Sequence, residues 1–143
     1  MKDIDAFLDR PWLARLATVN PQTLMPHVVP VWYGWDGASL WISAFRSTRK
    51  VKELLLNPRC SVVVDVGGEE QVPAEAGGLH AVLLEGEAEL VTAPQDLLEE
   101  KTTWVYTRYL GPQGVLAADP QSWIKDPENL LIKLTPTFIK AWK

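Results

Sequence analysis

The feature that most constrains the fold of this chain is a hairpin signal between two strand-like segments. Residues 24–35 are rich in valine and aromatic residues that alternate along one face, as in a half-buried strand. The dipeptide Asp36-Gly37 follows, which strongly favours a tight turn between antiparallel strands, and residues 39–44 are expected to form the return strand. Pro26 and Pro30 lack the N–H that a ladder needs. Strand 24–35 is therefore expected to lie at a sheet edge, to bend, or to leave one side open.

Further segments with a strand or helix pattern surround this hairpin. Apolar runs rich in β-branched residues predict strands at 13–19, 60–66, 79–91 and 130–141. Helical spacing predicts helices at 2–9, 48–56 and 92–109, and the glycine-rich, acidic stretch 67–78 is expected to be a surface loop. Six strands with short connections predict an antiparallel α+β barrel with a few peripheral helices, because closing the sheet removes its unpaired edges.

Length and charge limit the class of protein. With 143 residues, the chain is expected to form a single domain over residues 1–143. No apolar run approaches the ~20 residues of a membrane-spanning helix, and the acidic N-terminus lacks the apolar centre of a secretion signal. The only cysteine, Cys60, excludes an internal disulfide framework and a cysteine zinc site, so a cytoplasmic protein is expected. A net charge of -4 and a pI near 5.2 argue against a nucleic-acid-binding surface.

One short segment concentrates positive charge. Residues 46–59 contain five of the 14 lysine and arginine residues but a single acid, Glu53. If one of the two preceding hydroxyl residues is the N-cap, Arg49 and Lys50 lie in the first turn of helix 48–56. Cations there oppose the helix dipole by ~0.3–1 kcal/mol each. A bound anion would remove this conflict, because the first turn also offers unpaired N–H groups. The segment therefore predicts a phosphate-binding site, with an ordinary solvated helix end as the alternative.

Other residues that commonly carry chemistry are few. Glu85, Glu87 and Glu89 share one face of their strand, as expected of a solvent-exposed face, so no catalytic residue is assigned. His27 and His80 are the only histidines, and neither has a neighbour at metal-ligand spacing; each is either a hydrogen-bonded structural residue or part of a ligand site. No metal site is expected. The seven tryptophans supply apolar area for a core or a subunit interface, or a stacking surface for an aromatic ligand.

With these elements in order, the chain resembles the pyridoxamine 5'-phosphate oxidase-like, FMN-binding split-barrel superfamily over residues 17–65. The matching stretches are Ala17–Val19, Pro26–Trp32, Asp36–Ser43, Ser47–Leu54 and Asn57–Val64. Glu85–Val91 and Leu134–Trp142 are similar to later strands of the same proteins. The ordered series carries the likeness rather than any one motif. It implies an antiparallel six-stranded split β-barrel.

The resemblance also implies a cofactor site. In such proteins FMN lies at a homodimer interface, and an Arg-Lys pair with its preceding hydroxyl residue holds the phosphate. Carried over to this chain, the cofactor-binding residues would be Val28, Val29, Pro30 and Val31 beside the flavin ring, Ser43 on the hairpin, and Ser47, Thr48, Arg49 and Lys50 at the phosphate. The chain departs from the family in having Ala44 where many members have threonine. It also lacks the basic residues with which the oxidase proper binds its vitamin B6 substrate.

The resulting hypothesis is a homodimeric, FMN-dependent oxidoreductase that acts on a small hydrophobic or aromatic substrate. Two alternatives keep the fold. One is a reductase that uses the deazaflavin coenzyme; the other is a non-catalytic flavin- or haem-binding protein with His27 or His80 as a candidate axial ligand. A further alternative is an interaction domain whose tryptophans serve only dimer contact.

Overall fold

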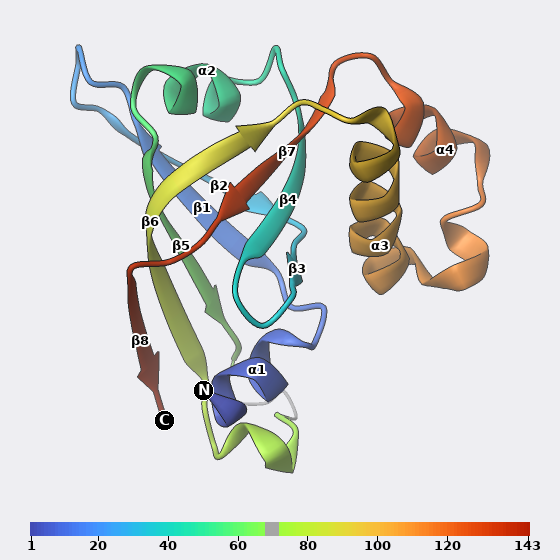
Figure 1. The fold of residues 1–143 in the computed structure, drawn as a ribbon. Helices are drawn as coiled ribbons and strands as arrows, with labels where there is room; N and C mark the ends of the chain where they lie inside the picture. Colours follow the sequence, from blue (N-terminus) through green and yellow to red (C-terminus); the bar gives the residue numbers. More distant parts are fainter. Residues whose placement is uncertain (68–71) are drawn as a thin grey trace.

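A computed structural model describes residues 1–67 and 72–143 of the chain (Figure 1). Its strands form one curled antiparallel sheet, with α1 and α2 near opposite ends of the sheet and α3 and α4 beside it. In chain order the elements are α1 (Lys2–Leu8), β1 (Ala14–Val19), β2 (Pro26–Val31), β3 (Gly34–Trp35), β4 (Leu40–Phe45), α2 (Arg49–Leu56), β5 (Arg59–Asp65), the short 3₁₀ helix η1 (Ala74–Ala76), β6 (Ala81–Val91), α3 (Gln95–Gly114), α4 (Ala118–Lys125), β7 (Asn129–Leu134) and β8 (Phe138–Trp142).

The order of strands across the sheet is β2-β1-β5-β6-β7-β4-β3, and the neighbouring pairs are antiparallel. The long strand β6 joins the two halves of the sheet, because residues 81–87 pair with β5 and residues 88–91 pair with β7. β8 pairs with residues 81–85 of β6, so β7 and β8 follow one another along this strand (Figure 1). This curled half-barrel confirms the predicted α+β, antiparallel split-barrel class.

The predicted number of strands, six, is wrong because two of the predicted strands are interrupted. Segment 24–35 divides into β2 and β3, and segment 130–141 divides into β7 and β8, which gives eight strands in the described part of the chain. At the first break the backbone of Tyr33 bonds to α3 instead of a strand: its N–H donates to the Tyr109 hydroxyl, and its carbonyl accepts from Arg108. At the second break Pro136 has no N–H to donate. β2 and β3 are the two ends of the sheet order, so the predicted edge position is confirmed.

The predicted helices form within a few residues of their expected bounds, and α3 loses its helical geometry at Gly111, where φ is 81°. Helix α4 was not predicted, because its eight residues are mostly polar or small and include Pro120. Residues 68–71 of the expected loop 67–78 lie outside the described residues, while 74–76 form η1, which packs beside α1 with Ala76 buried. No helix within residues 1–67 and 72–143 has the length and apolar character needed to cross a lipid bilayer.

The interior of the half-barrel is filled by alternate residues of its strands. Leu16 of β1, Val62 of β5, Leu84 of β6 and Ile132 of β7 are all 0% exposed. α2 lies over the end of the barrel that is uppermost in Figure 1, where its buried face adds Val51 and Leu54 to the core. A smaller cluster attaches α3 to the sheet through Trp41, Val91, Leu98 and Leu131. The strand–helix unit that carries the predicted phosphate site is therefore fixed to the main core.

Candidate functional site

The first turn of α2 is free of side-chain capping. Thr48 is the N-cap residue, with extended φ and ψ of -73° and 151°. Its hydroxyl donates backwards to the Phe45 carbonyl at 2.7 Å rather than accepting from a helix amide. The first amides of α2 thus have no side-chain acceptor among the described residues, and such a helix end attracts anions.

Arg49 is oriented by a buried acid of the same helix. Its Nε donates to Glu53 Oε2 at 2.8 Å, and the other oxygen of Glu53 accepts the Thr18 hydroxyl at 2.7 Å. Glu53 is only 4% exposed, but these donors, Arg49 first, hold its pKa below the ordinary value despite the opposing effect of burial. The pair leaves the two terminal nitrogens of Arg49 without a hydrogen bond to any described residue.

Lys50 is half-buried in a small pocket of about 190 Å³. It forms no ion pair within the described residues, and burial lowers the pKa of its ammonium group. The pocket brings together four residues that were expected to bind a cofactor and that come from three elements: Pro30 and Val31 of β2, Ser43 of β4, and Lys50 of α2. An unpaired cation in a partly dry pocket suits an anionic ligand group.

The other expected residues lie outside this pocket lining. Val28 is 65% exposed on the outer face of β2, while Val29 is half-buried and packs against the core. Ser47 is exposed, and its N–H donates to Glu128 Oε1 at 3.1 Å. Thr48 and Arg49 flank the lining through the first turn of α2. The structure therefore groups four of the nine predicted residues in one pocket and places an unpredicted acid, Glu128, beside a fifth, Ser47.

Four lining residues were not assigned to this site from the sequence: Trp32, Val105, Tyr106 and Trp123. The Tyr106 ring lies nearly perpendicular to the Trp32 ring, at a centroid distance of 5.8 Å, and to the Trp123 ring, at 6.1 Å. The Tyr106 hydroxyl lies 3.3 Å from Ser43 Oγ, 63 positions away in the chain. The large number of tryptophans was the available signal, but only the tertiary fold selects which of them face the pocket.

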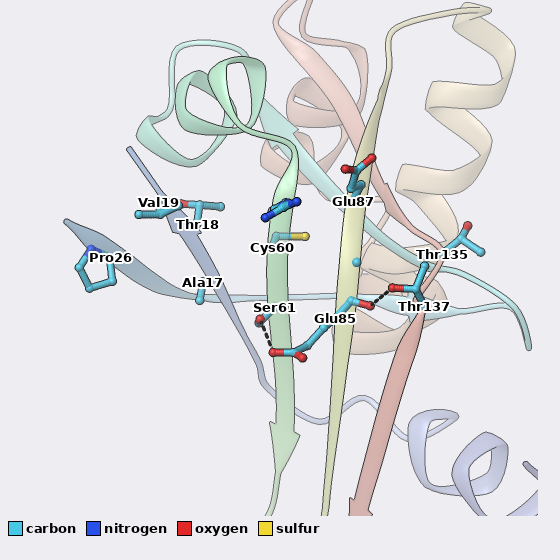
Figure 2. A pocket seen from close by; sticks show the side chains of 12 residues that line it. Ala17, Thr18, Val19, Pro26, Cys60, Ser61, Glu85, Glu87, Thr135 and Thr137 are labelled. Carbon is cyan, nitrogen blue, oxygen red and sulfur yellow. Dashed lines mark hydrogen bonds between the residues drawn. The ribbon is translucent and has the colours of Figure 1, made fainter. Parts of the chain in front are cut away.

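A larger groove of about 710 Å³ lies elsewhere, along β1, β5 and β6 and the link between β7 and β8 (Figure 2). Arg59, Glu85 and Glu87 line it, and Ser61 donates to Glu85 Oε2 at 3.0 Å. Glu87 is exposed, as expected of a solvated strand face. Cys60 also lines the groove, but burial raises its pKa to about 11, which keeps the thiol protonated and unreactive at neutral pH. The smaller pocket suits an anion better, because its described lining has no carboxylate, whereas Glu85 and Glu87 line the groove together with Arg59.

The two histidines do not share a site. His27 is half-buried on β2, opposite Thr18 at one end of β1. His80 is exposed, and its carbonyl accepts from Val66 beyond the far end of β5. Within the part of the chain that the structure describes, no three His, Cys, Asp or Glu side chains are grouped as a metal site.

Solved structures with the same fold include proteins of different activities. The protein Rv2991 from Mycobacterium tuberculosis is 23% identical, with a TM-score of 0.76 over 99% of this chain and 82% of that one. An F420 reductase is 25% identical, with a TM-score of 0.68 over 95% of this chain and 94% of that one. HutZ, the haem storage protein from Vibrio cholerae, is 16% identical, with a TM-score of 0.72 over 96% and 91% of the two chains.

No curated protein sequence matches this chain. The sequence pattern of the pyridoxamine 5'-phosphate oxidase family, however, matches residues 1–143. The chain therefore belongs to the pyridoxamine 5'-phosphate oxidase family.

Proposed function

We propose that this protein is an FMN-binding oxidoreductase that acts on a small molecule. The observation that carries the proposal is the pocket in which Ser43, Lys50 and the end of β2 meet. These residues come from separate elements, and the family resemblance had assigned each of them to one cofactor. A half-buried ammonium group beside uncapped helix amides supports a phosphate as the ligand group.

The residues present fit the phosphate of FMN. Lys50 would bind it as a point charge, and the terminal nitrogens of Arg49, whose Nε is already held by Glu53, would bind its oxygens. β2 would lie along the flavin ring, because it is an edge strand with two prolines and its outer side makes no ladder. When bound, the flavin supplies hydride or electron transfer, and the protein supplies position and electrostatics.

A second copy of the chain would complete the site. The pocket of about 190 Å³ is smaller than the ~300–1,000 Å³ typical of small-molecule sites, so one chain supplies only part of the walls. Leu24, Met25 and Val28, on and just before β2, are 74%, 60% and 65% exposed. Leu24 also has φ of 60°, a conformation that costs a non-glycine residue ~1–2 kcal/mol. Exposed apolar side chains on a strained segment support a homodimer contact at this edge.

Titration of FMN, followed by quenching of flavin fluorescence, tests the proposal. Lys50→Ala should raise the Kd by about 10- to 100-fold, because a charged hydrogen bond is worth ~1.5–3 kcal/mol. Lys52→Ala is the matched control: it removes the same charge from an exposed position of α2 and should change the Kd less than about twofold. Equal effects of the two substitutions, or none, would remove the assignment.

The arginine needs a separate design, because Arg49→Ala alone would leave the buried Glu53 carboxylate without its partner. Arg49→Ala should therefore be made together with Glu53→Gln and compared with Glu53→Gln alone. A further loss of FMN affinity of about tenfold is expected in the double variant. Light scattering with and without FMN should show a dimer, and a monomeric FMN complex would contradict the shared site.

The deazaflavin coenzyme is the second candidate cofactor. The likeness to an F420 reductase over 95% of this chain supports it, and both cofactors carry a phosphorylated chain. Parallel titrations with FMN and coenzyme F420 separate the two. For a haem-binding role, the likeness to HutZ supports the fold alone, and neither histidine lines the pocket.

A single, buried thiol also suits a reducing compartment, and we place the protein in the cytoplasm.

A further inference from the structure

β8 is an edge strand with a neighbour on one side only. It pairs antiparallel with residues 81–85 of β6, and no other described strand pairs with it. Figure 1 shows β8 at the left margin of the sheet, with no helix or strand of the described residues beyond it. Alternate residues of a strand direct their N–H and C=O groups to opposite sides. Part of the β8 backbone is therefore left without a ladder partner on its outer side.

The edge of β8 is less protected against pairing than the edge of β2. β2 has Pro26 and Pro30, which cannot donate to an added strand. β8 has no proline, and four of its five residues are apolar. Phe138 and Trp142 are 49% and 41% exposed, and Lys140, between them on the same face, is the only charged residue of the strand.

A pocket of about 300 Å³ adjoins the other face of β8. Ala141 and Ile139 lie on this face and pack against the core. The pocket is lined by Ala141, by Leu79 just before β6, and by the start of α1: Met1, Lys2, Asp3 and Ile4. A residue directly opposite Ala141 in an added strand would share its face, so its side chain would lie beside this pocket.

The charge on Lys140 indicates what can pair with this edge. Lys140 makes no ion pair within the described residues, and its Nζ lies over the Trp142 ring, 5.1 Å from the centroid. If two copies of β8 paired antiparallel over their full length, the two Lys140 side chains would lie opposite each other. Like charges in that position destabilise a strand pair, whereas an acidic residue opposite Lys140 would stabilise it.

We infer that the outer edge of β8 binds an extended peptide segment of another protein, which adds a strand to the sheet and places an acidic residue opposite Lys140. Main-chain hydrogen bonds supply the affinity, and the pocket beside Ala141 selects a large apolar residue next to the acid. An antiparallel segment, as in the rest of the sheet, then has the pattern apolar, large apolar, acidic, apolar, apolar. This site shares no residue with the proposed cofactor pocket and does not depend on the proposed function.

Fluorescence anisotropy with a labelled peptide tests the inference. The probe is Ser-Val-Leu-Glu-Val-Thr-Ser, whose leucine would lie opposite Ala141 and whose glutamate would lie opposite Lys140. The wild type should bind it about 3- to 10-fold more tightly than the same peptide with lysine in place of glutamate, and Lys140→Glu should reverse this preference. Lys125→Glu is the matched control: it reverses a charge at an exposed position of α4 and should leave the preference unchanged.

Modified peptides separate backbone pairing from side-chain contact. N-methylation of alternate residues removes the N–H groups on one side of an extended peptide. Of two probes methylated on complementary sets, the one that loses the side facing β8 should bind at least about tenfold more weakly, while the other retains its affinity. Ala141→Leu fills part of the pocket, so it should weaken the leucine probe more than a probe with alanine at that position.

Three results would overturn the inference: no binding of either peptide up to about 1 mM, equal effects of the two methylated sets, or a preference that Lys140→Glu does not change. A peptide that binds only after dilution has dissociated a dimer would assign this edge to a second copy and would overturn it as well. None of these results bears on the FMN titration, so the proposed function is tested separately.

Discussion

Arg49 and Glu53 form an ion pair across one turn of α2, with the Arg49 Nε 2.8 Å from Glu53 Oε2. The second oxygen of Glu53 accepts the hydroxyl of Thr18 on β1, so one buried carboxylate connects the helix to the barrel wall. The exposed guanidinium group is thus oriented from inside the fold. Glu53 thus links Arg49, at the candidate site, to Thr18 in the barrel wall, so its substitution should change the stability of the fold.

Glu53→Gln should make stability less sensitive to acid. The pKa of Glu53 is lowered in the folded state, chiefly by Arg49. Its carboxylate therefore stabilises the folded state at pH values above 4.5, the ordinary pKa of the group. That contribution is lost as the pH falls through the lowered pKa. Urea unfolding at pH 7 and pH 3 should differ less for the variant than for the wild type. Glu100→Gln, at an exposed position of α3, should retain the wild-type difference; a difference that Glu53→Gln leaves intact would refute the linkage.

Lys50→Met should stabilise the protein in the absence of ligand and weaken FMN binding at the same time. Burial lowers the pKa of Lys50, which means that the fold disfavours its charged form at neutral pH. An apolar side chain of similar length removes this cost, with a gain of about 0.5 kcal/mol because water still screens half of the group. Thermal unfolding without flavin measures the effect, and Lys52→Met is the control. A lower unfolding temperature for Lys50→Met than for the wild type would contradict the prediction that the charge of Lys50 favours FMN binding but destabilises the ligand-free protein.

Glu128→Gln should strengthen FMN binding. The Glu128 carboxylate accepts the Ser47 amide at 3.1 Å, beside the helix end where the phosphate is proposed to bind. Glutamine keeps an acceptor but removes the negative charge, which should lower the Kd about twofold to threefold at low salt. Salt screens exposed charges, so the gain should shrink in 0.5 M NaCl. A gain that does not depend on salt would point to a cause other than charge.

Gly34→Ala should destabilise the fold. A Cβ at this position of β3 would lie 2.5 Å from ring atoms of Trp104, which is too close for any real contact. Overpacking of this kind costs about 1–3 kcal/mol, and chemical denaturation measures it. The same substitution in a Trp104→Leu background should cost clearly less, because the smaller side chain leaves room. An equal cost in both backgrounds would show that the ring is not the obstacle.

The local features of this fold follow from short-range chemistry. The turn after β3 forms as predicted because the Asp36 carboxylate accepts the amides of Ala38 and Ser39 and the Trp41 Nε1, all within five residues. Thr48 is the N-cap residue of α2, one of the two hydroxyl residues expected there, although its hydroxyl donates to the Phe45 carbonyl rather than accepting from a helix amide. The alternation of apolar residues also predicted which strand faces fill the barrel.

The rest depends on contacts that no local pattern contains. The hydrogen bond from Ser43 to Asn129 joins positions 86 residues apart, and the aromatic wall from Tyr106 to Trp123 needs α4, whose polar sequence hides its helical character. The break after β2 likewise reflects two hydrogen bonds of the Tyr33 backbone: its N–H donates to the Tyr109 hydroxyl, and its carbonyl accepts from Arg108. Which side chains line the pocket could therefore be learned only from the tertiary structure.

The two residues between β2 and β3 have an effect that reaches beyond the pocket. Trp32 lines the pocket, and its neighbour Tyr33 is 0% exposed in the core. One of these adjacent residues can therefore contact a ligand while the other packs in the interior. They also join the first and last strands of the sheet order, where side chains of α3 take the place of a ladder. A ligand that immobilises Trp32 would therefore stabilise the connection between β2 and β3. Cofactor binding should then slow amide hydrogen exchange on both of these strands.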